Sequence, residues 1–180
     1  MIIALAAVAL ANAATSSPAS VPRLRDCSAS QLSITFDGEN GNFSGMSQSG
    51  TLLVVRNIGA TACRVPALPE LHFEDSAHQA LSIERQVPKG MHPGPVVVPV
   101  GIAPGAEATA LLHWVSGDVY DGHHCVSSAT AIVQIGASEY RQTFSGHFCS
   151  PANTPATFTQ AWLKTDSTLD KGNVETATKK

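Results

Sequence analysis

The segment CVSSATAIVQIGASEYRQTFSGHFC, residues 125–149, begins and ends with a cysteine and predicts a β-hairpin. Two runs rich in β-branched and aromatic residues, 130–135 and 140–144, lie on either side of residues 136–138, whose small side chains favour a turn. An antiparallel pair of strands is therefore expected in this part of the chain. The positions of the two cysteines show how these strands align.

The spacing of the cysteines predicts how they pair. A turn centred on Ala137 places residues at equal distances from it on opposite strands, and Cys125 and Cys149 both lie twelve residues away. A disulfide spans the distance between antiparallel partners, so we expect a bond across the open end of the hairpin. Four cysteines permit three pairings, and this one leaves Cys27 with Cys63. The strands next to these two run toward and away from one loop, so their outer ends can also meet.

Alternation of apolar and polar residues predicts strands along the rest of the chain. The predicted strands cover residues 31–36, 51–57, 71–73, 81–85, 96–100, 108–115 and 157–163. Residues 108–115 carry apolar side chains on both faces and are expected to form a central strand. About seven to nine short strands separated by turns are typical of an all-β fold, an immunoglobulin-like antiparallel β-sandwich.

The two ends of the chain predict an exported single domain. Residues 1–13 form an apolar run that ends in Ala-Asn-Ala, the small-x-small pattern of a signal peptide. This run is shorter than the roughly 20 residues of a membrane-spanning helix, so we expect no membrane span. We expect residues 14–26 to be flexible, 27–163 to form one β-sandwich domain, and 164–180 to be a disordered polar tail. Disulfides are typical of exported proteins, which predicts a secreted or periplasmic location.

The charge of the chain excludes two classes of partner. Its 180 residues carry a net charge of −3, and the lysines and arginines are scattered apart from Arg23 with Arg25 and the terminal Lys179 and Lys180. Nucleic acids and anionic membranes require clustered positive charge, so we expect neither as a partner. A protein or another ligand of the cell envelope is the expected partner, and the chain is expected to act as a monomer.

Histidines close to the hairpin cysteines raise the alternative of a metal site. The motifs DGHHC and SGHFC contain His123, His124 and His147, and imidazole binds both zinc and copper. In the predicted register His147 faces Ser127, and His124 lies three residues farther along, roughly 10 Å at about 3.3 Å per residue. An oxidising compartment also favours a disulfide over free thiolates. We therefore expect no cofactor, and a periplasmic Zn- or Cu-binding protein using these three histidines is the alternative.

No motif of catalytic residues is present in the sequence. GMSQSG, residues 45–50, has Ser49 where the G-x-S-x-G nucleophile elbow requires glycine. There is no H-E-x-x-H motif, no P-loop, and no G-x-G-x-x-G between a strand and a helix. We expect no catalytic residue and no enzymatic activity.

The order of these segments resembles a known family. Cys27 with SQLSITF is followed by GNFSGMSQSGTLLVVRNIGATACRVPALPEL, then by IAPGAEATALLHWVSG and Cys125. This order is similar to that of the bacterial domain of unknown function 4232, found in secreted and lipid-anchored proteins, over residues 27–149. The resemblance implies an immunoglobulin-like β-sandwich, and it carries over no catalytic residue.

The expected function is that of an exported, non-enzymatic binding or interaction module at the cell envelope. A rigid sandwich presents its loops at its two ends, which here are residues 37–50, 86–95 and 117–124. Within KGMHPGP we expect Met91 and His92 to form a contact loop. Proline and glycine keep this segment out of a sheet, and methionine makes adaptable contacts.

Overall fold

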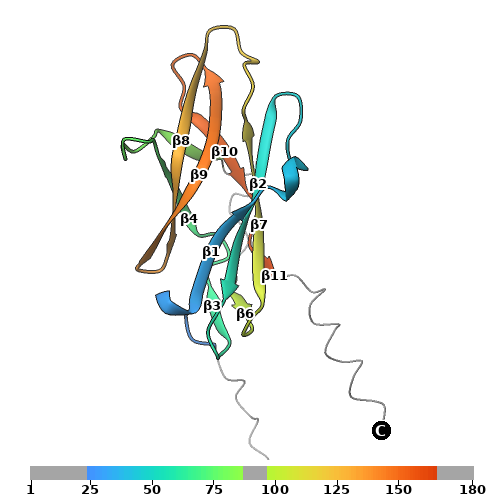
Figure 1. The fold of residues 1–180 in the computed structure, drawn as a ribbon, viewed down its shortest axis with the longest axis vertical. Coiled ribbons are helices and arrows are strands. Elements are labelled where there is room, and N and C mark those ends of the chain that lie inside the picture. Colours follow the sequence, from blue (N-terminus) through green and yellow to red (C-terminus); the bar gives the residue numbers. More distant parts are fainter. Residues whose placement is uncertain (1–23, 87–96, 166–180) are drawn as a thin grey trace, which may run out of the picture.

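The computed structural model describes residues 24–86 and 97–165, and within them the protein consists of β-strands without an α-helix (Figure 1). The elements are η1 (Ala29–Gln31), β1 (Leu32–Asp37), η2 (Glu39–Gly41), β2 (Gln48–Asn57), β3 (Cys63–Val65), β4 (Glu70–Glu74), β5 (Ile83–Gln86), β6 (Val100–Ile102), β7 (Glu107–Val115), β8 (His123–Ile135), β9 (Ser138–Pro151), β10 (Ala156–Gln160) and β11 (Lys164–Thr165), where η denotes a 3₁₀ helix. The predicted all-β class is confirmed. The predicted signal peptide, residues 1–13, lies outside the described residues.

One sheet, here called the large sheet, contains β1, β2, β7, β10 and β5 in that order, with β11 also paired to β7. β7 pairs antiparallel with β2 along one edge and with β10 and β11 along the other. The central position predicted for residues 108–115 is therefore confirmed. The predicted antiparallel pairing holds for every described pair of strands except β5 with β10, which pair in parallel. The chain reaches β5 from a different sheet rather than through a hairpin, which permits this direction.

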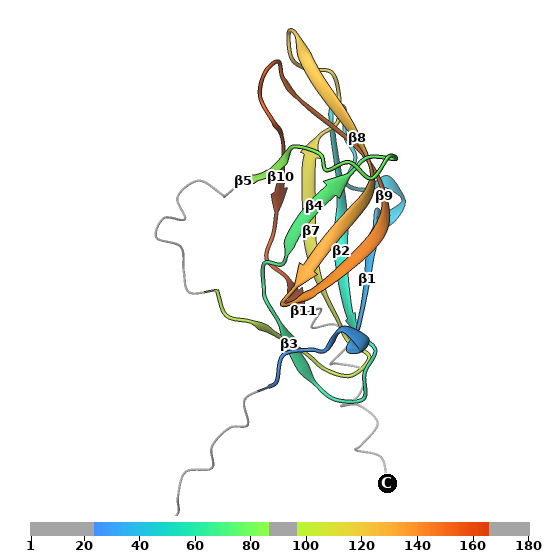
Figure 2. The same ribbon diagram turned by 90° about the vertical axis from the view of Figure 1, so that its left-hand side faces the viewer.

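A second sheet, here called the hairpin sheet, contains β4, β8 and β9 and lies over the large sheet (Figure 2). β8 pairs antiparallel with β4 on one side and with β9 on the other. The predicted hairpin is thus confirmed, and both of its strands are longer than expected because they continue past the end of β4. A separate pair, β3 with β6, lies near η1 at one end of the molecule (Figure 1).

Aromatic side chains from both sheets meet in the core. Phe73 of β4 contacts Phe158 of β10 with 5.4 Å between ring centroids, and Trp114 of β7 stacks on Phe148 of β9 at 4.9 Å. All four side chains are buried. Removing apolar surface from water contributes about 25 cal/mol per Å², and aromatic pairs add to this. These contacts therefore hold the two sheets together.

The turn of the β8–β9 hairpin is one residue shorter than the sequence predicts. Ile135 pairs with Ser138, so the turn contains Gly136 and Ala137 alone. Gly136 has a φ of 59°, a left-handed conformation that two-residue hairpin turns require and that glycine adopts without steric cost. The prediction of a turn centred on Ala137 is therefore wrong near the tip of the hairpin.

A β-bulge farther along the hairpin restores the predicted alignment of the cysteines. Thr130 pairs with Thr143, whereas Ser128 pairs with Gly146, so β9 contains one residue more than β8 in this interval. The extra residue brings the two cysteines of the hairpin directly opposite each other. The predicted pairing is correct because the shorter turn and the bulge offset each other.

Both predicted disulfides are present. Cys125–Cys149 joins neighbouring strands of the hairpin sheet, with Cα atoms 4.1 Å apart. Cys27–Cys63 joins the segment before η1 to β3, with Cα atoms 4.9 Å apart. Neither bond connects the large sheet to the hairpin sheet, whereas the disulfide of antibody domains connects their two sheets. The attachment of the two sheets therefore depends on the apolar core.

Buried Asn57 explains the Asn-x-Gly turn that follows β2. Its side chain is fully buried, and its amide nitrogen donates to the carbonyl oxygens of Thr61 and Ile102, both at 2.9 Å. Its amide oxygen accepts a hydrogen bond from the backbone of Gly59 at 2.9 Å. One carboxamide thus fixes the turn that leads into β3 and ties this turn to β6.

Several predicted strand boundaries are wrong. Of the strand expected at residues 96–100, the structure describes residues 97–100, and in this part β6 starts only at Val100 because Pro99 has no N–H group to donate to a neighbouring strand. The strand expected at residues 81–85 lies two residues later as β5, and the strand expected at 157–163 ends at Gln160. β3 was not predicted, since three residues are too few to show an alternating pattern.

Residues at both ends of the predicted domain are more ordered than expected. Asp26, assigned to a flexible segment, forms a bridge to Arg64 of β3. Lys164 and Thr165, assigned to the disordered tail, form β11 and pair with β7. Backbone hydrogen bonds to neighbouring strands explain both corrections, because such long-range pairing is not visible in the local composition.

Candidate functional site

A cavity of ≈ 640 Å³, here called the turn cavity, opens between the start of the described chain and the turn of the β8–β9 hairpin. Its walls come from residues 26–29, from residues 66–68 after β3, from Val97 and Pro99, and from residues 135–138. In Figure 1 the turn of the hairpin lies close to η1 and β3. The cavity thus joins segments that are far apart in the sequence.

Covalent and hydrogen bonds fix one wall of the turn cavity. The Cys27–Cys63 disulfide anchors this wall, and the backbone N–H of Cys27 donates to the carbonyl oxygen of Arg64 at 3.0 Å. Directly after it, the backbone N–H of Ser28 donates to the side-chain oxygen of Gln31, and the backbone N–H of Gln31 donates to the carbonyl oxygen of Ser28, both at 3.0 Å. This reciprocal pair closes η1 in the manner of a capping box.

A charged pair lies at the edge of the turn cavity. Arg64 Nε donates to Asp26 Oδ1 at 2.7 Å, and the side chain of Asp26 is 81 % exposed. An exposed ion pair contributes at most about 1 kcal/mol to stability. Both charges therefore remain available to a ligand at the surface.

Beside the opposite wall of the turn cavity, two residues after its lining residue Ser138, lies a tyrosine whose pKa is raised. Tyr140 O–H donates to the carbonyl oxygen of Ala29 at 3.3 Å, which connects the hairpin to η1. Burial raises the pKa of Tyr140 above its usual value, and a hydrogen bond to the Ser138 side chain partly opposes this increase. Burial therefore favours the neutral phenol over the phenolate.

The turn cavity is bordered by exposed apolar residues. Val97 contributes to its wall and is 42 % exposed, and the neighbouring Val98 is 70 % exposed. Pro66, Leu68 and Ile135 provide further apolar surface in the wall. Small-molecule and peptide sites are concave and mostly apolar, with a few polar groups, and the turn cavity has this composition.

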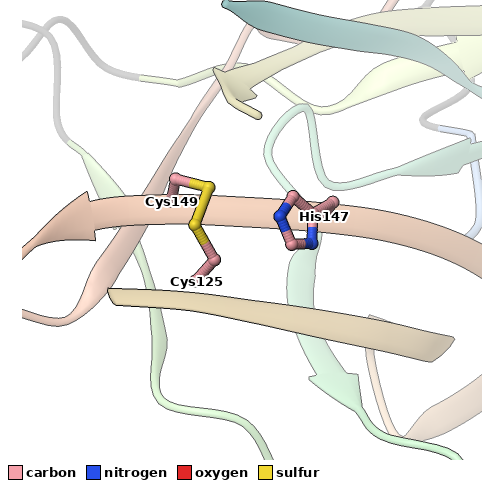
Figure 3. Close-up of side chains that lie close together, drawn as sticks. All are labelled: Cys125, His147 and Cys149. Atoms are coloured by element: carbon pink, nitrogen blue, oxygen red, sulfur yellow. A yellow bond between two sulfur atoms is a disulfide. The ribbon is translucent and has the colours of Figure 1, made fainter. Parts of the chain in front are cut away.

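The structure gathers one of the three candidate metal-binding histidines with the hairpin disulfide. His147 lies beside Cys125 and Cys149, and the ligand atoms of these three residues are all within 4.8 Å of one another (Figure 3). His147 Nδ1 is also 3.0 Å from Ser127 Oγ, as the predicted facing of these two residues implies. We call Cys125, His147 and Cys149 the Cys–His cluster.

The other two candidate histidines are not part of this cluster. His123 Nδ1 lies 2.5 Å from the carboxylate oxygen Oδ1 of Asp118 in the preceding loop. His124 pairs across the strands with Ser150, and its carbonyl oxygen accepts a hydrogen bond from the Ser150 hydroxyl at 3.3 Å. In residues 24–86 and 97–165, the Cys–His cluster is the one group of three or more potential metal-binding residues whose ligand atoms lie close together, and its two sulfur atoms are joined in the disulfide.

Comparison with known proteins identifies the family. A family model described as a domain of unknown function (DUF4232) matches residues 27–169, which is most of the chain. The chain belongs to the DUF4232 family. No curated protein and no solved structure matches it. The resemblance noted in the order of its segments is thereby confirmed, and the family description assigns no activity.

Sequence reasoning did not find the turn cavity of this DUF4232 protein. The predicted working surfaces were the loops 37–50, 86–95 and 117–124, and the predicted contact residues Met91 and His92 lie outside the described residues. The turn at residues 136–138 was recognised only as a connection. The sequence does contain one indication of this cavity. The predicted Cys27–Cys63 bond anchors the segment around Cys27, and an anchored segment can lie against the hairpin.

The described part of this DUF4232 chain contains no helix whose length and hydropathy would let it cross a membrane.

Proposed function

We propose that this DUF4232 chain is an exported, non-enzymatic binding module of the bacterial cell envelope, with an immunoglobulin-like β-sandwich as its scaffold. The turn cavity is the observation that carries the proposal. It has a volume of ≈ 640 Å³, within the range of about 300–1,000 Å³ that is typical of ligand sites. Its ligand is an apolar segment of an envelope protein.

The walls of the turn cavity support binding of such a segment. Covering an apolar side chain with Val97, Leu68 and Ile135 removes hydrophobic surface from water, which contributes about 1.5–3 kcal/mol for each side chain fully buried. The neighbouring Asp26 and Arg64 supply one acceptor and one donor for polar groups of the ligand. Apolar walls provide affinity, and the charged pair orients the ligand.

Bonds within the chain hold the walls of the turn cavity in place, so the site does not have to fold when a ligand binds. One wall is closed by the Cys27–Cys63 disulfide, and the other is a two-residue turn whose strands pair without interruption from Ile135 and Ser138 to Thr130 and Thr143. A preformed site loses little conformational entropy when a ligand binds. The frame therefore lets a modest apolar surface provide useful affinity.

The chemistry of the cavity wall supports a non-enzymatic role. Its hydroxyl groups belong to Ser28 and Ser138, and no histidine occurs among its described lining residues to act as their general base. The one carboxylate among these lining residues, Asp26, accepts a hydrogen bond from Arg64 and from neither serine. A nucleophile with its base, the minimum for acyl-transfer chemistry, is absent from these lining residues.

Export is supported by the disulfides. Cys27–Cys63 and Cys125–Cys149 account for all four cysteines, and such bonds persist in oxidising compartments. Together with the signal-peptide pattern in residues 1–13, they favour a secreted or periplasmic location.

Capture of envelope proteins by the immobilised chain tests the proposal. Ala137 is exposed in the cavity wall, and Ala137→Trp places an indole ring in the cavity. We expect this variant to lose at least about tenfold in affinity for a captured protein, which corresponds to about 1.4 kcal/mol. The matched control is Ala152→Trp, an exposed alanine in the turn after β9 and outside the cavity lining, which should bind like the native chain.

Equal capture by the native chain and by Ala137→Trp would contradict the cavity as the binding surface. Met91→Ala with His92→Ala tests the contact loop predicted from the sequence in the same assay. We expect weaker capture by this variant while folding is preserved. Unchanged capture would refute the contact loop and leave the proposal for the turn cavity standing.

A further inference from the structure

We propose that Cys125, Cys149 and His147 form a redox-controlled zinc site, which is closed while the two cysteines share a disulfide and opens when a thiol reductant cleaves it. This inference concerns the open end of the β8–β9 hairpin and is independent of the turn cavity at its other end. It also differs from the predicted set of three histidines, of which it retains only His147.

Strand geometry places the three side chains on one surface. Cys149 and His147 are two residues apart on β9, so their side chains point to the same face of the sheet. Cys125 of β8 is the direct partner of Cys149, and Ser127 is the direct partner of His147. Backbone pairing of β8 with β9 therefore brings the three side chains together.

The distances in the Cys–His cluster fit a zinc ion after a small adjustment of side chains. Tetrahedral zinc binds sulfur at about 2.3 Å and nitrogen at about 2.0–2.1 Å, which places neighbouring ligand atoms roughly 3.3–3.8 Å apart. The ligand atoms of the three residues already lie within 4.8 Å of one another. Cleavage of the disulfide lets the two sulfur atoms separate from bonding distance to this spacing by rotation about Cα–Cβ.

The histidine is oriented for metal binding. Its Nδ1 lies 3.0 Å from Ser127 Oγ, and Figure 3 shows a ring nitrogen on the side of the disulfide. When Nδ1–H donates to Ser127, Nε2 carries the free electron pair that a metal needs. A hydrogen bond to the second ring nitrogen is the usual way in which proteins fix a metal-binding imidazole. Ser127 thus acts as a positioning residue.

Solvent reaches the cluster from the outer face of the hairpin sheet. His147 is exposed, Cys125 is half-buried and Cys149 is buried, at 4 % exposure. A reductant can therefore approach the bond from the side of Cys125. Three protein ligands leave one position of a tetrahedral ion for water or for a further ligand.

Opening of the site is a two-electron reduction. A dithiol reductant gives two electrons and two protons to the disulfide: the Sγ–Sγ bond breaks, two S–H bonds form, and the reductant becomes a cyclic disulfide. Zn²⁺ then replaces the two thiol protons, which pass to the buffer, without a further change in oxidation state. Because the same two sulfur atoms form either the disulfide or the metal site, the two states exclude each other. Bound zinc should consequently slow reoxidation of the thiols.

Titration with Co²⁺, a spectroscopic substitute for Zn²⁺, tests this site in the full chain under anaerobic conditions. We expect the oxidised protein to show no thiolate-to-cobalt absorption and the reduced protein to bind one Co²⁺ per chain, which Zn²⁺ displaces. His147→Ala should weaken Co²⁺ binding by at least about tenfold, in line with the effect of losing groups around a metal. His72→Ala is the matched control, an exposed histidine of β4 in the same sheet, and should bind like the native chain.

Three results would overturn the proposal. The first is equal Co²⁺ affinity of His147→Ala and His72→Ala, and the second is binding that persists in Cys125→Ser with Cys149→Ser. Cys27→Ser with Cys63→Ser separates the two cysteine pairs, and we expect it to keep the Co²⁺ site. The third result concerns a chain that unfolds when it is reduced. In that case the proposal requires Co²⁺ to restore the near-ultraviolet circular dichroism of the folded protein, and a spectrum that stays unfolded would overturn it.

Discussion

The β8–β9 hairpin contains two halves that are built on different registers. In the turn half, residues 130–143, β8 pairs on both sides, with β4 and with β9, and the turn borders the turn cavity. In the open half, residues 123–128 and 146–151, β8 extends past β4 and pairs with β9 alone. The open half instead carries the disulfide. In one half of the hairpin β8 thus has two neighbouring strands, and in the other half a covalent bond takes the place of the second neighbour.

A local irregularity in the strand pairing determines whether the hairpin disulfide can form. If the register of the turn half continued unchanged, Cys125 would face Phe148, and Cys149 would face His124. A shift of one residue also turns side chains toward the other face of the sheet. The bulge at Ser128 and Gly146 corrects this by one residue. The disulfide, and with it the Cys–His cluster, therefore depends on the bulge.

The hydrogen bonds of a single serine explain how the bulge is held. Ser128 is buried, and its Oγ accepts a hydrogen bond from the backbone N–H of Gly146 at 3.1 Å. The same hydroxyl lies 3.2 Å from the carbonyl oxygen of Phe144, to which it donates. Backbone groups that lose a ladder partner at a bulge must bond elsewhere, and Ser128 supplies that partner.

Removal of the hairpin disulfide gives the largest expected effect. Cys125→Ser with Cys149→Ser frees a loop with a sequence separation of 24, for which chain entropy predicts a loss of about 3.5 kcal/mol in the free energy of unfolding. Guanidinium unfolding without reductant measures this loss. Native-state hydrogen exchange then separates the two halves, and faster exchange is expected in the open half while the turn half keeps its protection. Equal loss of protection in both halves would show that the hairpin opens as one unit.

A methyl group at the bulge gives the next largest effect. In Gly146→Ala the new Cβ would lie 2.5 Å from Phe144 Cε1, 2.6 Å from Phe148 Cε2 and 2.9 Å from Ser128 Oγ. Overpacking of this kind costs roughly 1–3 kcal/mol, and we expect about 2 kcal/mol by urea unfolding. Gly38→Ala is the matched control, since its Cβ would meet nothing within 4 Å. If the two variants unfold at the same urea concentration, the prediction is wrong and the bulge relaxes around the methyl group.

The hairpin also shows how far the sequence predicts this fold. Alternating residues and the small turn residues predict the hairpin, the central strand at residues 108–115 and both disulfides. The bulge is not predictable in this way, because it depends on the buried hydroxyl of Ser128 and on the space beside Gly146. The parallel β5–β10 pair and the anchoring of Asp26 are also long-range features, which local patterns do not contain.

The candidate sites were predictable only in part. The sequence singles out His147 near the hairpin cysteines, and alternation along β9 explains why it joins them. His124 fails to join because it lies on β8 beyond Cys125, opposite Ser150. Predicting the turn cavity would require knowing that residues 26–29 lie near the hairpin turn. These segments are more than 100 residues apart, and no sequence pattern connects them.

Titration of Tyr140 gives the smallest expected effect and concerns the turn half alone. Burial raises the pKa of its phenol in the folded chain above the ordinary value of 10.0. Well below pH 10 the phenol is neutral in both the folded and the unfolded chain, so it contributes no pH dependence there. As the pH rises through 10, the unfolded chain ionises first and releases the proton that the folded chain keeps. The free energy of unfolding of the native chain should therefore decrease in this range.

Urea unfolding of the native chain and of Tyr140→Phe between pH 8 and pH 11, values chosen to bracket the ordinary phenol pKa of about 10, measures this decrease. The difference in free energy of unfolding between the native chain and Tyr140→Phe should be constant at the lower pH values and should shift against the native chain at the higher pH values. Ser138→Ala removes the hydrogen bond that opposes the increase in pKa, so it should enlarge the fall. If the stabilities of the native chain and of Tyr140→Phe respond identically to pH, the phenol of Tyr140 is exposed to solvent. The contact of Tyr140 with Ala29, which connects the hairpin to the wall of the turn cavity, would then be absent in solution.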